Sequence, residues 1–216
     1  MNINAESSGH RDSYHTSRRK RVLDIAGSSL ALTALSPLIM ISPLVKLLGT
    51  GPIIFEHQRV GRGGEKFGCL KIRTMVVDAD EVLQRMLATD PEAKITWNRE
   101  RKLVKDPRVT SFGRILRKLS LDELPQVYNV LIGEMSLVGP RPVVEEELLS
   151  YGRSVRFYKM CKPGITGLWQ VSGRSDISYF ERVKLDRLYA QKASLKLDML
   201  ILVKTLPAVL KLRGAY

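Results

Sequence analysis

The sequence predicts an α+β chain that is mainly helical, with one small β-hairpin and a single domain behind an N-terminal membrane helix. Three observations support this prediction: an uncharged apolar run near the N-terminus, a glycine-rich turn between two β-type segments, and helical periodicity in the last third. A length of 216 residues suffices for one domain with its own core and a short appendage.

The composition indicates an anionic partner and a reducing compartment. The chain has 35 Lys and Arg against 22 Asp and Glu, a formal net charge of +13. Such a surplus favours binding to nucleic acid, acidic lipid headgroups or a phosphorylated substrate. Cys69 and Cys161 are far apart and lack zinc-ligand spacing, so we expect packed free thiols. Residues 1–17 are polar and serine-rich, and we expect a disordered tail there.

The apolar run follows Asp24, and residues 25–45 carry no charge. This length matches a membrane helix better than a buried helix of a soluble protein, which is the alternative. Both flanks are rich in Lys and Arg, the residues that mark the cytoplasmic side of a membrane. A segment that enters and leaves the membrane on the same face is consistent with both flanks.

Ser36 and Pro37 lie near the middle of this run. A proline ring removes one helical hydrogen bond and clashes with the preceding turn. A helix from Arg21 to Ser36 extends about 24 Å, less than the roughly 30 Å of a hydrocarbon core. We therefore expect residues 18–48 to form a re-entrant helix broken at Ser36-Pro37, in preference to a proline-kinked helix that spans the membrane.

The elements after this segment follow from turn signals and periodicity. Residues 53–75 have the pattern of a β-hairpin, with Gly61, Gly63 and Gly64 available for positive φ. Residues 78–100 are predicted to be helical with an interruption at Asp90-Pro91, and residues 114–133 to form a second helix that ends near Gly133. Helices are also predicted over residues 177–190 and 194–212. The last one alternates apolar and basic residues, a pattern that suits either an acidic membrane surface or packing on the core.

The densest group of chemically useful residues is RKLSLDELPQ. Asp122 and Glu123 are adjacent carboxylates that follow Arg117 and other basic residues. One interpretation is structural, because Ser120 and Glu123 have the spacing of a capping box at a helix start. The other is chemical, because a carboxylate beside arginines stays ionised and can act as a nucleophile or metal ligand.

Two later loops carry further candidates for phosphate binding. Arg141 lies between two prolines in GPRP, which restrict its backbone and can pre-position its guanidinium group for phosphate oxygens. A solvated arginine in a rigid turn is the alternative. In KPGITGLWQVSGR, Lys162 and Arg174 could neutralise a diphosphate. Trp169 could stack on a base, although core packing is the more usual role of tryptophan.

Together these motifs resemble a known family. From about Arg18 to Tyr216, the chain is similar to the bacterial sugar transferases, the monotopic polyprenyl-phosphate phosphoglycosyl transferases. The likeness is greatest to the members that begin exopolysaccharide synthesis from UDP-hexoses, notably the undecaprenyl-phosphate galactose phosphotransferases. The segments that carry it are KRVLDIAGSSLALTALSPL, LKIRTM, DPRVTSFGRILRKLSLDELPQVYNVLIGEMSLVGPRPVV, KPGITGLWQVSGRSD and the terminal RGAY.

The resemblance implies a re-entrant helix and a catalytic domain over residues 49–216 on the cytoplasmic face of the bacterial inner membrane. It implies that Asp122 attacks the sugar-linked phosphate of a UDP-sugar, releases UMP and passes the sugar phosphate to undecaprenyl phosphate. Glu123 would position metal or relay a proton, and Mg²⁺ held by Asp122 and Glu123 would neutralise the diphosphate.

The resemblance also extends the set of phosphate-binding candidates. It implies this role for Arg117 and Arg141, and Arg73 is expected to join them with Lys162 and Arg174. Asp198 matches a charged position of the family without a defined role. Galactose is the expected sugar and glucose the alternative, and a homodimer is one possible assembly.

Two other classes of protein remain as alternatives. The charge of +13 would suit a basic, membrane-tethered nucleic-acid-binding protein, but aromatic residues are only 6% and no nucleic-acid-binding motif is present. We therefore expect no nucleic-acid partner. A structural membrane scaffold is the third class, and it would tolerate replacement of Asp122 and Glu123.

Overall fold

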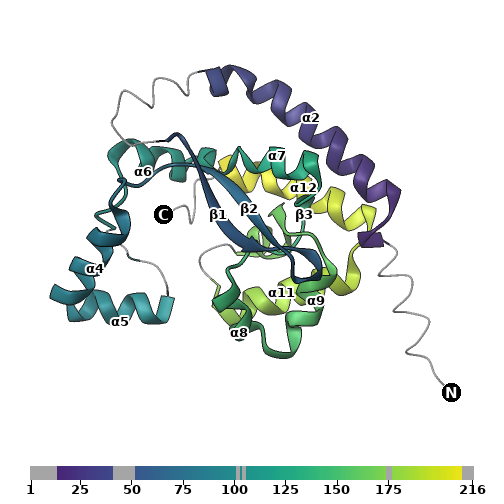
Figure 1. Ribbon diagram of the computed structural model, residues 1–216. Coiled ribbons are helices and arrows are strands. Elements are labelled where there is room, and N and C mark those ends of the chain that lie inside the picture. Colours follow the sequence, from purple (N-terminus) through teal and green to yellow (C-terminus); the bar gives the residue numbers. More distant parts are fainter. Residues whose placement is uncertain (1–13, 41–51, 101–102, 104–105, 174–176, 211–216) are drawn as a thin grey trace.

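The computed structural model describes residues 14–40, 52–100, 103, 106–173 and 177–210. Within these residues the fold is mainly helical, with two small two-stranded sheets (Figure 1). The helices are α2 (Arg18–Met40), α4 (Ala79–Thr89), α5 (Pro91–Glu100), α6 (Ser111–Lys118), α7 (Gln126–Ile132), α8 (Leu148–Tyr151), α9 (Val155–Met160), α10 (Leu168–Ser172), α11 (Tyr179–Lys192) and α12 (Leu195–Leu210). The strands are β1 (Ile54–Val60), β2 (Lys66–Ile72), β3 (Ser136–Val138) and β4 (Gly164–Thr166).

The predicted hairpin is confirmed. Strands β1 and β2 pair antiparallel, with Ile54 opposite Ile72 and Val60 opposite Lys66. The turn between them is a short 3-10 helix, η1 (Arg62–Gly64). Gly63 and Gly64 have φ of 74° and 92°, where glycine avoids the steric cost of a side chain. Gly61 was also expected there, but its φ is −97°.

Helix α2 lies along one side of the molecule, and its first half packs on α7 and β3 (Figure 1). The packed stripe is polar: Lys20, Asp24 and Ser28 are buried at a spacing of four residues. The Lys20 ammonium is 2.5 Å from Asp198 Oδ2 in α12. The Asp24 carboxylate accepts hydrogen bonds from the Ser136 hydroxyl and the Leu137 backbone N–H. Paired charges therefore fix the helix to the domain.

A break in the helix at Ser36-Pro37 was predicted from the sequence, but α2 does not end there. The helical backbone continues through both residues to Met40. A proline removes one hydrogen bond from a helix, but the helix can continue past it with a kink. The expected return segment falls on residues 41–48, which lie outside the described residues. No helix among the described residues has both the length and the apolar character required to cross a membrane.

Tyr14 to Ser17 pack on the domain, although the sequence analysis placed them in a disordered tail. The Tyr14 hydroxyl donates to Asp198 Oδ2 at 2.7 Å, and His15 Nε2 lies 3.0 Å from the Ala190 carbonyl oxygen. The remainder of the predicted tail, residues 1–13, lies outside the described residues. The packed part of the chain therefore begins before Arg18.

The predicted interruption at Asp90-Pro91 separates α4 from α5, but the single helix predicted over residues 114–133 is wrong. The chain forms α6, a 3-10 turn named η2 (Leu121–Glu123), and then α7. Ser120 has a left-handed backbone (φ 56°, ψ 23°), and Pro125 precedes the first residue of α7. Both features interrupt regular helical hydrogen bonding. Helix α7 ends at Gly133, as predicted, with φ of 94°.

The core lies between the hairpin and the C-terminal helices. Asn129 of α7 is buried and binds β2 through both ends of its amide: Oδ1 accepts from the Leu70 N–H, and Nδ2 donates to the Gly68 carbonyl. Helices α11 and α12 confirm the two helices predicted near the C-terminus. Ile201 of α12 is buried in the core, while Val203 is exposed, so α12 packs on the domain and also presents apolar residues outward.

Candidate active site

Asp122 and Glu123 belong to η2, between α6 and α7. Thr110 caps the start of α6 by accepting a hydrogen bond from the Gly113 N–H at 2.9 Å. The left-handed Ser120 then reverses the chain, and η2 packs against β2. The Ser120 side chain forms no capping hydrogen bond, so the capping-box interpretation is wrong at this position. The turn instead serves to direct two adjacent carboxylates toward the hairpin.

Glu123 is paired with Lys71 of β2. The Lys71 ammonium lies 2.6 Å from Glu123 Oε1, and both side chains are partly exposed. Burial raises the pKa of Glu123, but Lys71 and the more distant Arg141 and Arg59 together hold this pKa below its ordinary value. Glu123 is therefore an ionised group at ordinary pH, fixed in place by a cation.

Asp122 has a different environment. The residue is 9% exposed, and its carboxylate forms no ion pair with any other described residue. Burial raises its pKa, Lys71 lowers it, the neighbouring Glu123 raises it, and Arg117 lowers it, with a net increase. A carboxylate that is little solvated and not held by a salt bridge keeps its lone pairs available for a substrate.

Arg117 is one of the cations that surround Asp122. Its Nε donates to the Thr74 hydroxyl at 2.8 Å, and Thr74 is buried just after β2. Burial lowers the pKa of Arg117, and Asp122 raises it. The hydrogen bond to Thr74 uses one edge of the guanidinium group, so the remaining N–H donors can bind a phosphate oxygen.

Arg141 lies in the loop before η3 (Glu145–Glu147) and acts electrostatically on Glu123. Its Nη1 is 3.4 Å from Glu147 Oε2, and the same carboxylate group is 3.5 Å from Arg59 Nη1. The backbone of Val143, two residues later, pairs with Val60 of β1. The GPRP loop is thereby attached to the hairpin, and it brings a half-buried arginine near Glu123.

Three predicted site residues have other surroundings. Arg73 follows β2, donates from Nε to the Pro52 carbonyl oxygen and lies over the Phe55 ring at 5.1 Å. Trp169 is covered by the Arg182 guanidinium at 5.0 Å, which favours packing over base stacking. Arg174 lies outside the described residues.

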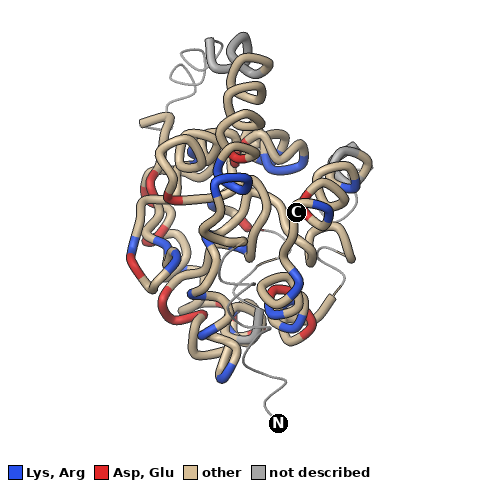
Figure 2. Tube along the Cα trace, turned by 90° about the vertical axis from the view of Figure 1, so that its right-hand side faces the viewer, with Lys and Arg blue, Asp and Glu red and all other residues tan. Residues whose placement is uncertain are grey.

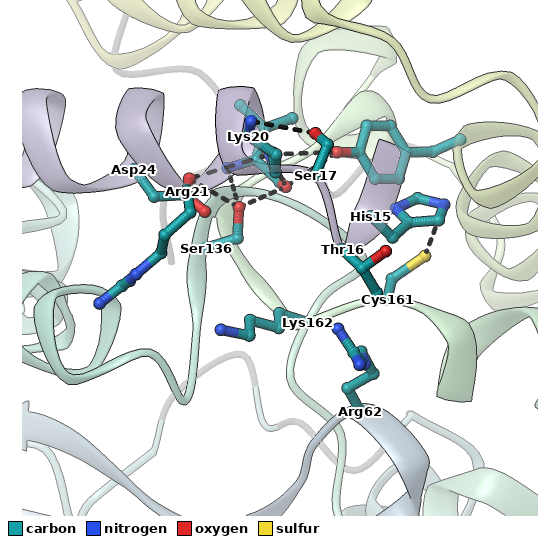
Figure 3. Close-up of a pocket in the computed structure, with 12 residues that line it drawn as sticks. His15, Thr16, Ser17, Lys20, Arg21, Asp24, Arg62, Ser136, Cys161 and Lys162 are labelled. Carbon is teal, nitrogen blue, oxygen red and sulfur yellow. Dashed lines mark hydrogen bonds and ion pairs between the residues drawn. The ribbon is translucent and has the colours of Figure 1, made fainter. Parts of the chain in front are cut away.

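The structure places two further candidates apart from the dyad. Asp198 is fully buried and accepts hydrogen bonds from the Tyr14 and Tyr189 hydroxyls as well as from Lys20. Through Lys20 it connects α12 to α2. Lys162 lines a cavity with Arg62 of the hairpin turn (Figure 3). This turn lies at the end of the hairpin opposite Lys71, about 17 Å away at the rise of an extended strand.

Lys71, Arg59 and Glu147 were not predicted as site residues from the sequence. Lys71 and Arg59 point from a hairpin whose strand pairing could be predicted, but their distance from residues 122 and 123 depends on tertiary packing. Glu147 comes from a run of three glutamates, which resembles a solvated surface segment in sequence. Only the folded chain brings these charges together.

The donor groups at the dyad are compatible with Mg²⁺. Mg²⁺ prefers oxygen ligands and is usually held by one or two carboxylates together with substrate phosphates. Asp122 and Glu123 offer such a pair. Among the described residues there is no group of three or more His, Cys, Asp or Glu side chains that could hold a metal ion by itself. A metal ion bound at the dyad would therefore require ligands from the substrate or from water.

Two adjacent carboxylates with Lys71 and Arg117 close to them, and Arg141 near Glu123, form the candidate active site. The family model for bacterial sugar transferases matches residues 15–212, so this chain belongs to the bacterial sugar transferase family. It is a phosphoglycosyl transferase.

Three relatives show the range of proteins to which the chain is similar. It is 52% identical over 198 residues to exopolysaccharide production protein ExoY of Sinorhizobium fredii, covering 91% of this chain and 88% of the relative. It is 50% identical to undecaprenyl-phosphate galactose phosphotransferase of Salmonella typhimurium, covering 91% of this chain and 41% of that longer protein. It is 38% identical to UDP-glucose:undecaprenyl-phosphate glucose-1-phosphate transferase of Caulobacter vibrioides, covering 92% and 72%.

Proposed function

We propose that this enzyme transfers a hexose-1-phosphate, with galactose as the preferred sugar, from a UDP-hexose to undecaprenyl phosphate. The product would be the first lipid-linked intermediate of exopolysaccharide assembly. The observation that carries the proposal is the Asp122 carboxylate, which is little exposed, has no ion-pair partner among the described residues and is surrounded by cations. The relatives' names support the acceptor, the transferred group, a UDP-sugar donor and a role in exopolysaccharide production.

The first step would be attack by an Asp122 carboxylate oxygen on the sugar-linked phosphorus of the UDP-hexose. A bond forms between this oxygen and phosphorus, and the bond from phosphorus to the oxygen of UMP breaks. UMP leaves with the electron pair, and the hexose phosphate remains on Asp122 as an acyl phosphate. Arg117 and Arg141 hold the phosphate oxygens, and they stabilise the charge that develops on them.

The second step would use the same side chain as the leaving group. An oxygen of the undecaprenyl phosphate headgroup attacks the phosphorus, the bond to Asp122 breaks, and the carboxylate is regenerated. Both steps are displacements at one phosphorus atom, so the site binds one bulky substrate at a time. Glu123, paired with Lys71 at 2.6 Å, maintains the position of the turn beside the reacting atoms.

Asp122 and Glu123 would hold Mg²⁺ together with substrate phosphate oxygens, and the bound ion would supply positive charge that neutralises the diphosphate. Basic side chains of the enzyme would also neutralise part of the diphosphate charge. Lys71 and Arg141 are within electrostatic range of Glu123, and both lower its pKa. Glu123, held ionised in this way beside Asp122, is suited to a divalent cation.

We propose that the enzyme is monotopic on the cytoplasmic face of the bacterial plasma membrane, with residues 18–48 as a re-entrant segment and residues 49–216 as the catalytic domain. Exposed apolar side chains on α2 and α12 support this placement, among them Leu30 at 72% and Val203 at 62% exposure. Burial of such side chains in lipid is favourable, and the basic residues of α2 and α12 suit acidic headgroups.

The function is tested by incubating the purified full chain with undecaprenyl phosphate, Mg²⁺ and one UDP-sugar at a time, and by measuring UMP. We expect release with UDP-galactose to exceed release with UDP-glucose, UDP-N-acetylglucosamine or UDP-glucuronic acid at least tenfold. Arg141→Gln should lower kcat/KM by one to two orders of magnitude, because it removes a charge-assisted phosphate contact. A preference for UDP-glucose would show that glucose, and not galactose, is the transferred sugar. Absence of UMP release from every UDP-sugar would refute the proposed function.

A further inference from the structure

The cavity that contains Lys162 is separate from the dyad, because neither Asp122 nor Glu123 lines it. Its volume is about 260 Å³, and it lies between the start of α2, the hairpin turn and the segment before β4. Figure 3 shows Arg21 descending from α2 while Lys162 and Arg62 approach from below. Side chains from three separate parts of the chain therefore bring positive charge to one place.

Lys162 and Arg21 meet beside Gly133, where α7 ends. A Cβ atom added to Gly133 would lie 3.3 Å from the Lys162 Nζ and 3.6 Å from the central carbon of the Arg21 guanidinium group. The Lys162 and Arg21 charges are therefore no more than about 7 Å apart. Such an arrangement is unfavourable in a partly buried setting unless an anion lies between or beside them.

Arg21 is fixed in this position by the protein. Its Nη1 and Nη2 donate to the carbonyl oxygens of Val130 and Leu131, the last turn of α7, at 2.6 and 2.5 Å. The bonded carbonyls belong to the C-terminal end of α7, where helix carbonyls lack regular partners one turn further on, although Val130 also accepts from the Gly133 N–H at 3.1 Å. The two Arg21 bonds hold the guanidinium group rigid, with N–H donors to spare for a second acceptor.

The positive charge in the cavity is not neutralised by the part of the chain that the structure describes. Lys20 is the exception, because it is paired with Asp198 and lies 3.8 Å from Asp24. Arg21, Arg62 and Lys162 form no ion pair with a described carboxylate. Burial, Arg21 and Arg62 lower the pKa of Lys162, and only Asp24 opposes them.

The remaining lining adds polar groups beside these cations, among them the hydroxyl-bearing residues Thr16 and Ser17. Asp24 also lines the cavity, and its carboxylate accepts hydrogen bonds from the Ser136 hydroxyl and the Leu137 N–H. The Tyr189 hydroxyl donates to Asp198. A phosphate group bound by proteins typically meets cations from two or more directions together with hydroxyl or N–H donors. The cavity offers both kinds of group.

We propose that this cavity is a second anion site, which binds one phosphate-type oxyanion through Lys162, Arg62 and Arg21. The phosphate could be free in solution or belong to an acidic lipid headgroup, since α2 also carries the exposed apolar residues proposed to contact the membrane. The proposal does not depend on the chemistry at Asp122. A site at this position would couple occupancy by phosphate to the docking of α2 on α7.

The first test measures binding of inorganic phosphate to the purified full chain at pH 8, by equilibrium dialysis at constant ionic strength with chloride as the replacing anion. We expect a saturable site of one phosphate per chain that Lys162→Gln weakens at least tenfold. Lys162→Arg should retain it, and so should Lys94→Gln, which removes an exposed positive charge from α5. Arg141→Gln removes a cation beside the dyad and should also leave the Lys162-dependent binding in place.

The second test identifies the source of the phosphate by flotation with vesicles of phosphatidylcholine, with or without phosphatidylglycerol. For a lipid headgroup, Lys162→Gln and Arg62→Gln should reduce recovery with phosphatidylglycerol vesicles at least threefold more than Lys94→Gln does. If the site binds free phosphate, all three variants should be recovered equally with the vesicles, and Lys162→Gln should still bind inorganic phosphate more weakly in the dialysis experiment.

Folding of the variants is checked by thermal unfolding in buffer without phosphate. Lys162→Gln should be no less stable than Lys94→Gln there, because it removes a charge from beside other cations. The proposal is overturned if Lys162→Gln binds phosphate as tightly as the wild type does and is also recovered with phosphatidylglycerol vesicles to the same extent as Lys94→Gln. It is also overturned if Lys162→Gln is destabilised in phosphate-free buffer and phosphate shifts its melting temperature as much as that of the wild type.

Discussion

Asp186 is a buried carboxyl group beside Arg141, one of the candidate site residues. It lies in α11, is 2% exposed, and accepts a hydrogen bond from the Tyr151 hydroxyl at 2.8 Å. Its Oδ1 has no hydrogen-bond partner among the described residues, and the Arg141 backbone N–H and guanidinium group face the same carboxyl group. Burial raises the pKa of Asp186 to about 7, while Tyr151 and Arg141 oppose the rise.

This shift predicts a pH dependence of stability. The unfolded chain loses the Asp186 proton near its ordinary pKa of 3.8, whereas the folded chain keeps it up to about pH 7. The folded state therefore binds more protons between these values, and the free energy of unfolding falls as pH rises through this window. Thermal unfolding from pH 4.5 to 8 should show a decline in the wild type that Asp186→Asn reduces.

Tyr151 and Tyr179 face the same carboxyl group, but their pKa values are raised, so neither titrates in this window. An identical pH slope in the wild type and Asp186→Asn would contradict the assignment. Below about pH 7, a neutral Asp186 adds no second negative charge beside Arg141, which Glu147 already contacts at 3.4 Å.

At the scale of single elements, η2 is the turn on which the dyad depends. Ser120 is the only described residue other than glycine with positive φ, and its side chain makes no capping bond. A left-handed conformation costs a residue with a side chain roughly 1 to 2 kcal/mol. Strained backbone of this kind is common in turns that carry functional groups.

Ser120→Gly should therefore raise the free energy of unfolding by up to about 1 kcal/mol, since glycine removes the steric cost but adds entropy to the unfolded chain. The matched control is Ser178→Ala at the start of α11, where Ser178 and Glu181 form the capping box that is absent at Ser120. The free energy of unfolding of this control should fall by about 1 kcal/mol. Urea unfolding measures both, and a loss of stability in Ser120→Gly would indicate that its side chain has a stabilising role.

At the scale of the whole molecule, charge and apolar exposure have different distributions. Lys and Arg occur on many elements of the molecule, together with fewer Asp and Glu (Figure 2). Large exposed apolar side chains include Val22 and Leu30 on α2 and Met199, Leu200 and Val203 on α12. Figure 1 shows α2 on the side of the molecule opposite α8. We infer that the α2 side faces lipid.

The inference predicts different effects for two leucines of similar exposure. Leu30 on α2 is 72% exposed, and Leu149 on α8 is 85% exposed. Leu30→Glu should reduce flotation of the full chain with vesicles that contain phosphatidylglycerol by at least fivefold, because a charge replaces a side chain buried in lipid. Leu149→Glu should have little effect. Equal losses from both variants would rule out a preferred orientation of this face.

The sequence predicted those parts of the fold that depend on local signals. The hairpin, the α4–α5 break, the end of α7 at Gly133 and the two C-terminal helices each follow from turn residues or periodicity. The break at Ser120 was missed because a left-handed serine has no clear sequence signature. The continuation of α2 through Pro37 shows that proline lowers the probability of a helix without excluding one.

The candidate site was predictable to a similar extent. The adjacent carboxylates and nearby arginines were apparent in RKLSLDELPQ and GPRP. The partners Lys71 and Glu147, and the separation of Lys162 and Asp198 from the dyad, depend on packing between distant segments. Lys20 and Asp198, for example, are 178 residues apart in sequence and form one buried ion pair. No local pattern predicts such a pair.

The most direct test of the central claim omits the lipid acceptor. The full chain is incubated with Mg²⁺ and the active UDP-sugar, UMP is measured, and the protein is quenched and analysed by peptide mass spectrometry. We expect a burst of about one UMP per chain and a hexose phosphate on the peptide that contains Asp122, both absent in Asp122→Asn. Turnover with undecaprenyl phosphate but neither a burst nor an Asp122 adduct in its absence would contradict covalent catalysis and indicate direct transfer.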